Sequence, residues 1–447
     1  MISKIKWKNH QILGNLELDF TKENGEIYNT IVIAGGNGTG KTTILETLAN
    51  FLGAGTIEPF ERISYEIENN PYEIIKNEES KQPLNYVRIN KSNDKKANVN
   101  QLFSKYSNNF SEDLRSFSFV YSKARSGFNT KKITTSTTNQ LDYTKYETDK
   151  NDDFTFVKQL LVDIDTQDNS EWMKITKTGV KITFDEFKEK SKLYRFEKAF
   201  NNFFENIKFE GVDNNNKEEK DIIFKKYDKR ISIDNMSTGE KQIVFRGALL
   251  LKNLNNLSGG IVLIDEPELS MHPKWQKKIL NYYRNLFKKD GIQNVQIIVA
   301  THSEYILQSA LEDYENSVII TLNDNNGVLE SEKITAPDIL PTITLAETNY
   351  IAFGIISKDY HNQLYGCLQN KTDNNTIKEC DDYILYNITA EDDTIYKKHS
   401  SYKTTSYETL STYIRNAIDH PSPDKEYTYE ELEKSIGLLR RLCREID

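Results

Sequence analysis

The sequence contains few cysteines, no long apolar run and no excess of positive charge. Its three cysteines, Cys367, Cys380 and Cys443, are odd in number and lack metal-ligand spacing, so neither a disulfide framework nor a zinc site is indicated. The longest apolar runs have the length of a strand, far short of the roughly 20 residues that a membrane-spanning helix needs. No basic and apolar leader follows Met1. We therefore expect a cytoplasmic protein without membrane contact.

The charge balance limits the kinds of partner. A formal net charge of −9 argues against a broadly cationic surface for nucleic acid, although a local basic groove remains compatible with it. With 37% hydrophobic and 28% charged residues, the composition is ordinary for a soluble globular protein. A length of 447 residues predicts two or three domains.

A glycine-rich segment, GGNGTGKT at Gly35–Thr42, stands between an apolar strand at Thr30–Ala34 and a helical pattern that begins near Ile44. Glycines in this position let backbone N–H groups turn towards phosphates, and the helix N-terminus adds a favourable dipole. Lys41 would reach the β and γ phosphates, and the Thr42 hydroxyl would hold Mg²⁺. The residues predicted to contact nucleotide are Gly35, Gly36, Asn37, Gly38, Thr39, Gly40, Lys41, Thr42 and Thr43.

Two later segments end buried strands with polar residues. Asp265 and Glu266 follow four apolar residues, so their carboxylates emerge at the carboxyl edge of a sheet, where α/β proteins place ligands. Asp265 is suited to hold Mg²⁺, and Glu266 is suited to orient or deprotonate the attacking water. His302 follows the next buried strand and would hydrogen-bond the γ-phosphate. The alternative for Asp265 and Glu266 is an acidic strand end at the surface. The alternative for His302 is a purely structural role.

The segment Ser237-Thr238-Gly239-Glu240, preceded by Met236, resembles the signature of the ATP-binding-cassette superfamily. In that superfamily two heads pair head to tail around ATP. The resemblance implies that Ser237 and Gly239, with Glu240 beside them, act on the nucleotide of a second chain, so that ATP closes a homodimer or a higher homo-oligomer.

The run DEPELSMHP at Asp265–Pro273 is similar to the soluble heads of bacterial defence ATPases related to SMC proteins and to overcoming-lysogenization-defect nucleases. The likeness covers about residues 1–335 and extends to the AAA-type ATPases of Septu, PARIS and retron-linked systems. It places Phe119–Arg125 where such heads link the lid to the nucleotide, although Arg125 is also compatible with an ordinary surface arginine.

The order of apolar strands and helical patterns predicts an α/β head with a mainly parallel sheet covered on both faces. We predict an ATPase domain over 1–335 with lid insertions at about 53–220, and a helical domain over 336–447. From Gly53 to Ser116 apolar residues are too sparse to predict a large independent core. The predicted strands are Ile2–Trp7, Leu16–Phe20, Thr30–Ala34, Leu114–Tyr121, Ile222–Phe224, Gly260–Ile264, Val295–Ala300, Val318–Leu322 and Leu329–Ile334; helices are predicted at Phe184–Phe209, Gln242–Leu254 and Pro273–Phe287.

Near the C-terminus, Arg415-Asn416-Ala417-Ile418-Asp419-His420 resembles the R-N-x-x-x-H pattern of HEPN domains, helical bundles that often act as metal-independent ribonucleases. The resemblance implies that His420 is a general acid or base, that Arg415 stabilises the phosphate and that Asn416 orients one of them. Alternatively, Arg415 and Asn416 cap or salt-bridge a helical domain and His420 only ends a helix.

Three functions follow from these patterns. The leading one is an ATP-hydrolysing defence protein, with ATP and Mg²⁺ as cofactors, whose paired heads gate an RNA-cleaving C-terminal domain. The second is an ATPase sensor or scaffold that forms a homo-oligomer and controls a separate nuclease subunit in an antiphage system, with phage DNA or RNA as a possible further ligand. A DNA-repair ATPase of the SMC-like type is the third, and the lack of long heptad arms disfavours it.

Overall fold

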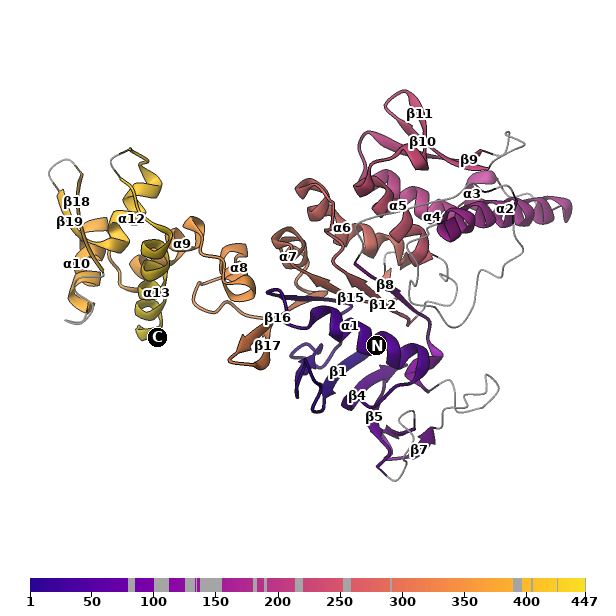
Figure 1. The fold of residues 1–447 in the computed structure, drawn as a ribbon, viewed down its shortest axis with the longest axis horizontal. Helices are drawn as coiled ribbons and strands as arrows, with labels where there is room; N and C mark the ends of the chain where they lie inside the picture. The colour runs from indigo at the N-terminus through magenta and orange to yellow at the C-terminus, as the bar shows by residue number, and fades with distance from the viewer. Residues whose placement is uncertain are drawn as a thin grey trace. The chain divides into compact units, whose positions relative to one another are not determined.

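The computed structural model describes residues 1–78, 85–99, 112–124, 133, 135–136, 155–179, 183–188, 191–213, 220–251, 259–289, 292–388, 396–402, 405–423 and 425–446 (Figure 1). The predictions for Arg125 and for most of the lid insertion between 125 and 154 therefore lie outside the described residues. The chain divides into two units, Met1–Lys333 and Ile334–Asp447. No helix within the described ranges combines the length and the apolarity that crossing a bilayer needs.

A six-stranded sheet forms the centre of the first unit. Its order is β17 (Val328–Ile334), β16 (Ser317–Asn325), β3 (Thr30–Gly35), β15 (Gln296–Thr301), β12 (Ile261–Asp265) and β8 (Phe119–Ser122). The strands from β16 to β8 pair in parallel. Strands β3, β12 and β15 are buried along their whole length, which explains why they are continuously apolar in the sequence. The predicted α/β class is confirmed.

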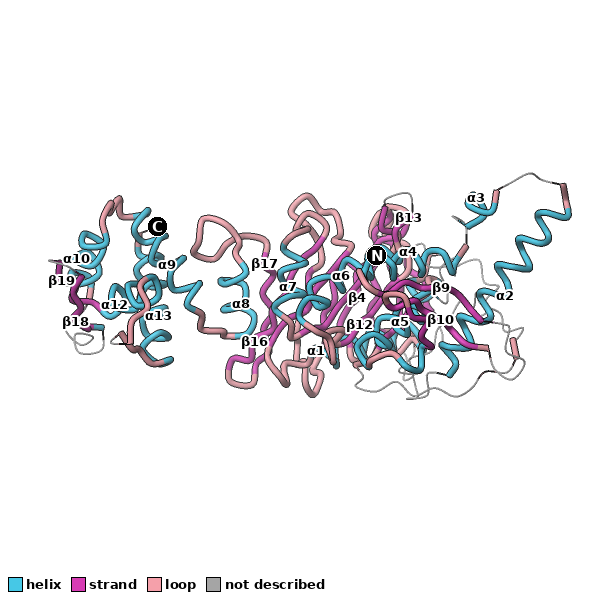
Figure 2. Tube along the Cα trace, turned by 90° about the horizontal axis from the view of Figure 1, so that it is seen from above, coloured by secondary structure: helices cyan, strands magenta, loops and turns pink. Residues whose placement is uncertain are grey.

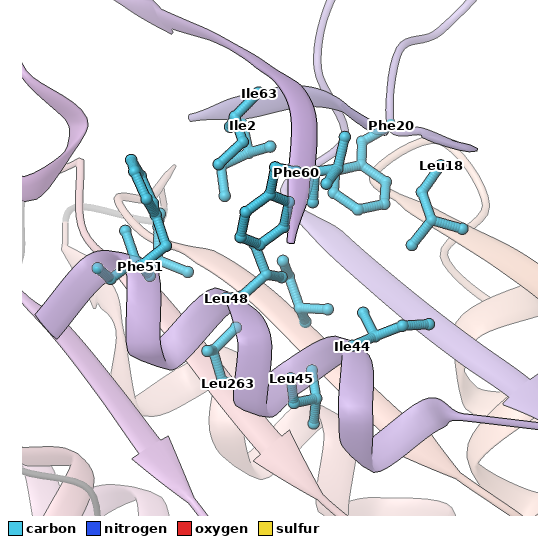
Figure 3. Packing of buried hydrophobic residues seen from close by; sticks show 14 of the residues in the cluster. Ile2, Leu18, Phe20, Ile44, Leu45, Leu48, Phe51, Phe60, Ile63 and Leu263 are labelled. Carbon is cyan, nitrogen blue, oxygen red and sulfur yellow. The ribbon is translucent and has the colours of Figure 1, made fainter. Parts of the chain in front are cut away.

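Helix α1 (Lys41–Ala54) packs between this sheet and a second, antiparallel one. The second sheet has the order β2 (Glu17–Asp19), β1 (Ile2–Trp7), β4 (Phe60–Ile67), β5 (Asn70–Lys76), β6 (Tyr86–Asn90) and β7 (Lys96–Val99). Figure 3 shows Leu48 and Phe51 of α1 beside Phe60, with Leu263 of the central sheet below the helix. Each fully buried aliphatic side chain here contributes roughly 1.5–3 kcal/mol. Trp7 is also part of this core, and its Nε1 donates to Thr47 Oγ1 of α1 at 3.1 Å.

The described strands between Gly53 and Ser116 form no separate core but join the core around α1, a contribution that their sparse apolar residues did not predict. Strands β4 to β6 alternate buried and half-buried side chains and share one core with α1, because they extend a sheet that begins at Ile2. The predicted strand at Leu114–Tyr121 is also shorter than expected. Leu114–Ser116 forms a 3-10 turn that Asp113 caps, and the strand starts at Phe119.

The remaining described elements of the first unit include the helix that begins in the signature segment. They are α2 (Thr155–Lys177), α3 (Phe184–Lys188), α4 (Lys192–Phe203), α5 (Thr238–Leu251), α6 (Pro273–Leu286) and α7 (Glu304–Leu311), accompanied by a three-stranded sheet of β9 (Ile207–Asp213), β10 (Asp221–Lys226) and β11 (Lys229–Ser232), the 3-10 turn η2 (Ile233–Asn235) and the short strands β13 (Lys288–Lys289) and β14 (Ile292–Gln293). The fully buried Lys158 of α2 lies 2.8 Å from Asp234 and 3.1 Å from Asp221. This cluster fixes α2 to the chain that leads into the signature.

The predicted helix at Phe184–Phe209 is two helices and the start of a strand. Ser191 interrupts it, because its side chain accepts a hydrogen bond from Tyr194 N and so begins a new helix. The chain then leaves α4 at Phe203 and enters β9.

The second unit is mainly helical (Figure 2). Its elements are α8 (Leu345–Phe353), α9 (Lys358–Lys371), α10 (Ile377–Asn387), the strands β18 (Lys397–Tyr402) and β19 (Thr405–Thr409), α12 (Leu410–Asp419) and α13 (Tyr429–Glu445). Thr428 and Glu431 form a capping box at the start of α13. Apolar side chains of α9, α12 and α13, including Leu364, Ile414 and Leu439, build a core of their own.

Candidate nucleotide-binding site

Three neighbouring strands end at the same edge of the central sheet. The glycine-rich loop follows β3, Glu266 follows β12, and His302 follows the last residue of β15, which lies between the other two strands. Parallel pairing brings these three strand ends together, because carboxyl ends of parallel strands share one edge. The topology therefore brings the glycine-rich loop together with two segments that follow it by more than 200 residues in the sequence.

A cavity of about 280 Å³ opens at this edge. It is lined by Ile12, Asn37, Gly38, Gly40, Lys41, Thr42, Thr43, Glu266 and His302. Gly38 and Gly40 have φ angles of 83° and 79°, a left-handed conformation that side chains disfavour, and Gly40 is the residue that begins α1. The cavity therefore sits at the N-terminus of a helix, where a phosphate is electrostatically favoured.

Lys41 is folded back into the loop. Its Nζ donates to the carbonyl oxygens of Gly35 and Gly36, both at 2.8 Å, and its residue surface is only 6% exposed. Burial lowers the pKa of Lys41 to about 8, although the nearby Glu266 and Asp265 carboxylates oppose this shift. A phosphate in the cavity would offer the ammonium group a stronger partner than two carbonyl oxygens.

Thr42 and Asp265, the two residues predicted to hold Mg²⁺, lie side by side. The Thr42 hydroxyl donates to Asp265 Oδ2 at 3.0 Å, whereas Asp265 Oδ1 is buried without a hydrogen-bond partner. Burial raises the pKa of Asp265 to about 6, and the neighbouring Glu266 adds to the rise. A buried acceptor that lacks a partner, beside a hydroxyl oxygen, is a donor set that suits Mg²⁺. The residues present therefore fit the ion.

Glu266 and His302 contact each other in the lining of the cavity, with 3.2 Å between Glu266 Oε1 and His302 Nε2. Burial and the charge of Lys41 lower the pKa of His302, while Glu266 partly opposes this shift, so the imidazole is neutral at pH 7. Glu266 has a φ of 41°, an uncommon conformation for a residue with a side chain, and its backbone N–H donates to Ala300 O at 2.9 Å. Backbone strain of this kind is concentrated at functional sites.

The signature residues lie outside this cavity. Ser237 is exposed, and its N–H donates to Glu240 Oε2 at 2.8 Å, while Glu240 Oε1 accepts from Lys226 at 2.8 Å. Gly239 permits close packing, because a Cβ there would lie 2.7 Å from Ser270 O. Both oxygens of Glu240 are thus used within its own chain. Contact of Ser237, Gly239 and Glu240 with a second nucleotide stays a prediction.

Sequence reasoning missed three residues at this site. Ile12, from the turn after β1, lines the cavity. Arg246 is buried in α5, and its guanidinium donates to Asp265 O and to Lys123 O, both at 3.0 Å. Glu268 accepts from Thr301 Oγ1 at 2.8 Å and from His302 N at 2.6 Å. For Glu268 the sequence offered a signal, because it is the second glutamate of the DEPE run. Ile12 and Arg246 had none, since their contacts depend on tertiary packing.

The predicted C-terminal motif lies on α12 in the second unit. Arg415 pairs with Asp419 at 2.8 Å, and its Nη1 donates to Asn416 Oδ1 at 3.0 Å. Asp419 also accepts from Asn362 Nδ2 at 3.1 Å. His420 is exposed and ends the helix with a φ of −130°. The structure thus joins Arg415 to Asn416 directly, while the Arg415 guanidinium is already paired with a carboxylate.

Residues 31–308 match the family model described as "AAA domain, putative AbiEii toxin, Type IV TA system". The chain is 40% identical over 92 residues to the Retron Vc95 probable ATPase of Vibrio cholerae serotype O1 biovar El Tor, over 19% of this chain and 17% of that protein. It is 39% identical over 95 residues to the Retron Ec83 probable ATPase of Escherichia coli, with the same two shares of 19% and 17%.

A third relative is the Septu protein PtuA of Bacillus thuringiensis, which is 31% identical over 101 residues, or 20% of this chain and 24% of that protein. The matches thus span less than a quarter of each relative's length. Among solved structures, an Smc head bound to the C-winged helix domain of ScpA aligns at 14% identity and a TM-score of 0.39, over 74% of this chain and 97% of that chain.

Proposed function

The chain belongs to this family of AAA domains, and from that premise we propose that it binds and hydrolyses ATP with the help of Mg²⁺. The observation that carries the proposal is the meeting of Lys41, Thr42, Glu266 and His302 around one cavity, with Asp265 bound to Thr42. Each of these residues supplies a group that phosphoryl transfer requires, namely a cation, a metal ligand, a base and a neutral hydrogen-bonding ring.

The roles follow from the chemistry of each side chain. Lys41 leaves the carbonyl oxygens of its own loop and binds the β and γ phosphates. Thr42 and Asp265 hold Mg²⁺, which supplies positive charge against the phosphate oxygens. Glu266 orients the attacking water, and the neutral His302 donates its single ring N–H to the γ-phosphate from a position beside Glu266.

Substitution Glu266→Gln tests this assignment. The amide keeps the size and the hydrogen-bonding reach of the carboxylate but cannot take a proton, so we expect retained ATP binding and a fall in turnover of about 100-fold or more. Glu312→Gln, at an exposed position after α7, is the matched control. Hydrolysis that continues at the wild-type rate in Glu266→Gln would remove Glu266 from the reaction.

We further propose that each site is completed by the signature segment of a second chain. Support comes from the exposure of Ser237 and from its position outside the cavity of its own chain. Substitution Ser237→Asp keeps a helix-capping side chain but adds a negative charge that repels phosphate. Mixing Ser237→Asp chains with Lys41→Ala chains should restore hydrolysis, because a mixed dimer contains one intact site. Two inactive proteins that stay inactive after mixing would argue that the site is complete within one chain.

The biological role that we propose is antiphage defence, with the paired heads gating RNA cleavage by the second unit. The likeness to retron ATPases and to a Septu protein supports the first part, and the Arg415, Asn416 and His420 motif supports the second. Substitution His420→Ala should abolish RNA cleavage and cellular toxicity but leave ATP hydrolysis intact. His399→Ala, at another exposed histidine of the same unit, is the control. Toxicity that survives in His420→Ala would refute cleavage by this motif.

The alternative is a sensor or scaffold that controls a separate nuclease. One observation favours it, namely that Asp419 and Asn416 already occupy the Arg415 guanidinium, as a structural helix pair would. Under this function, His420→Ala retains toxicity when the gene of the separate nuclease is expressed with it, whereas Glu266→Gln loses it. Expressing both variants with and without that gene separates the two functions.

A further inference from the structure

One carboxylate near the cavity has no part in the reaction outlined above. Glu268 lies in the turn after β12, two residues beyond Glu266, and it does not line the cavity. Its Oε1 accepts two hydrogen bonds, from Thr301 Oγ1 at 2.8 Å and from the backbone N–H of His302 at 2.6 Å. Glu268 therefore connects the turn after β12 to the end of β15, 33 residues further along the chain.

The hydrogen bonds of Glu268 also constrain the side chain of His302, which lines the cavity. Because Glu268 holds the main chain of His302, only the two torsions of the imidazole remain to be set, and the 3.2 Å contact with Glu266 sets them. Glu266 belongs to the same turn as Glu268, since Leu269 N–H donates to Glu266 O at 3.3 Å. One short turn thus contacts His302 through its main chain and through its ring.

Further hydrogen bonds extend this arrangement to two helices. Ser303 N–H donates to Thr301 Oγ1 at 2.9 Å, and Ser303 Oγ donates to Gln276 Oε1 of α6 at 2.6 Å while it caps α7. The segment from Thr301 to Ser303 is therefore held on both sides of His302. The second oxygen of Glu268, Oε2, is buried and has no hydrogen-bond partner. Burying this oxygen costs desolvation free energy, which only the hydrogen bonds to Oε1 offset.

We infer that Glu268 is the positioning residue for His302: it fixes the histidine backbone so that the imidazole meets Glu266 and the γ-phosphate together. This inference rests on the proposed ATP hydrolysis. It assigns Glu268 no contact with nucleotide, metal or water. Loss of Glu268 therefore slows the chemical step but leaves nucleotide binding by Lys41 and Thr42 intact.

Kinetics of three variants test the inference. Glu268→Ala should lower kcat by about 10-fold to 100-fold, as expected for a misplaced group at a reacting centre, with KM for ATP unchanged within about twofold. Glu268→Gln should stay close to wild type, because its side-chain carbonyl oxygen still accepts both hydrogen bonds. In a His302→Ala background, Glu268→Ala should cause no further loss, since its effect passes through His302.

Other results would overturn the inference. A Glu268→Gln variant as slow as Glu268→Ala would mean that the charge itself takes part, and additive losses with His302→Ala would mean that Glu268 acts by another route. If Glu268→Ala does not fold, Glu268→Asp replaces it in the comparison with His302→Ala, because the shorter side chain withdraws the carboxylate from both donors to Oε1. An unchanged kcat would then contradict the inference. The wild-type protein and Lys41→Ala run in parallel: if both hydrolyse ATP at the same rate, the proposed function fails, rather than the role of Glu268 alone.

Discussion

The buried ammonium of Lys41 makes nucleotide affinity depend on pH. Burial lowers the pKa of Lys41 to about 8 in the structure, and phosphates in the cavity would raise it again, because negative charge favours the protonated form. Nucleotide binding should therefore be coupled to protonation of Lys41, and the number of protons taken up should grow as the pH rises through 8. At pH 9 only about a tenth of the free protein carries this proton, so affinity should be about tenfold lower than at pH 7, or roughly 1.4 kcal/mol.

Calorimetric titration with a non-hydrolysable ATP analogue and Mg²⁺ at pH 7, 8 and 9 measures this change. Two buffers of different ionisation heat then give the number of protons taken up. His302 does not interfere, because its pKa is already lowered from 6.5 and the ring is neutral throughout this range. Lys41→Arg is the control, since a guanidinium stays charged at these pH values. Equal affinity at pH 7 and pH 9, or the same decline in Lys41→Arg, would refute the reasoning.

Two further predictions concern stability. His361 is fully buried against Ser435 and burial lowers its pKa from 6.5 to about 4, so the unfolded chain binds a proton first as the pH falls. The second unit should lose about 3 kcal/mol between pH 6.5 and pH 4, and thermal unfolding of His361→Gln should lack this slope. Gly239→Ala places a Cβ 2.7 Å from Ser270 O, whereas Gly437 has open space around it. Calorimetry should show a loss of about 1–3 kcal/mol for Gly239→Ala but a slight gain for Gly437→Ala; equal melting temperatures would contradict the packing.

Much of the first unit could be predicted from local sequence. Strands buried on both faces are continuously apolar, and the polar residues that end them, such as Asp265 and His302, must meet at one edge of a parallel sheet. The antiparallel sheet was harder to predict. Its strands are only half apolar, and their core becomes visible only when Ile2 and Phe60, 58 residues apart, are known to flank the same helix.

The contacts that tune the site could not be predicted in this way. The left-handed backbone of Glu266 and the bond from Glu268 to His302 depend on how two strand ends approach each other, which no local pattern encodes. The pair of Arg415 and Asp419 is different, because the second residue lies four positions after the first on one helix and such spacing favours an ion pair. That structural alternative was therefore already present in the sequence.

The tryptophans of the first unit allow changes in its packing to be followed by intrinsic fluorescence. Trp7 is buried and hydrogen-bonded to α1, the helix that begins at the phosphate loop, whereas Trp275 is half-buried against Gly239 in the signature. These two tryptophans are separate reporters, and Trp172 of α2 is the third tryptophan of the unit. Replacing one tryptophan at a time with phenylalanine would assign an emission change on nucleotide addition to the loop helix or to the signature, without any attached dye.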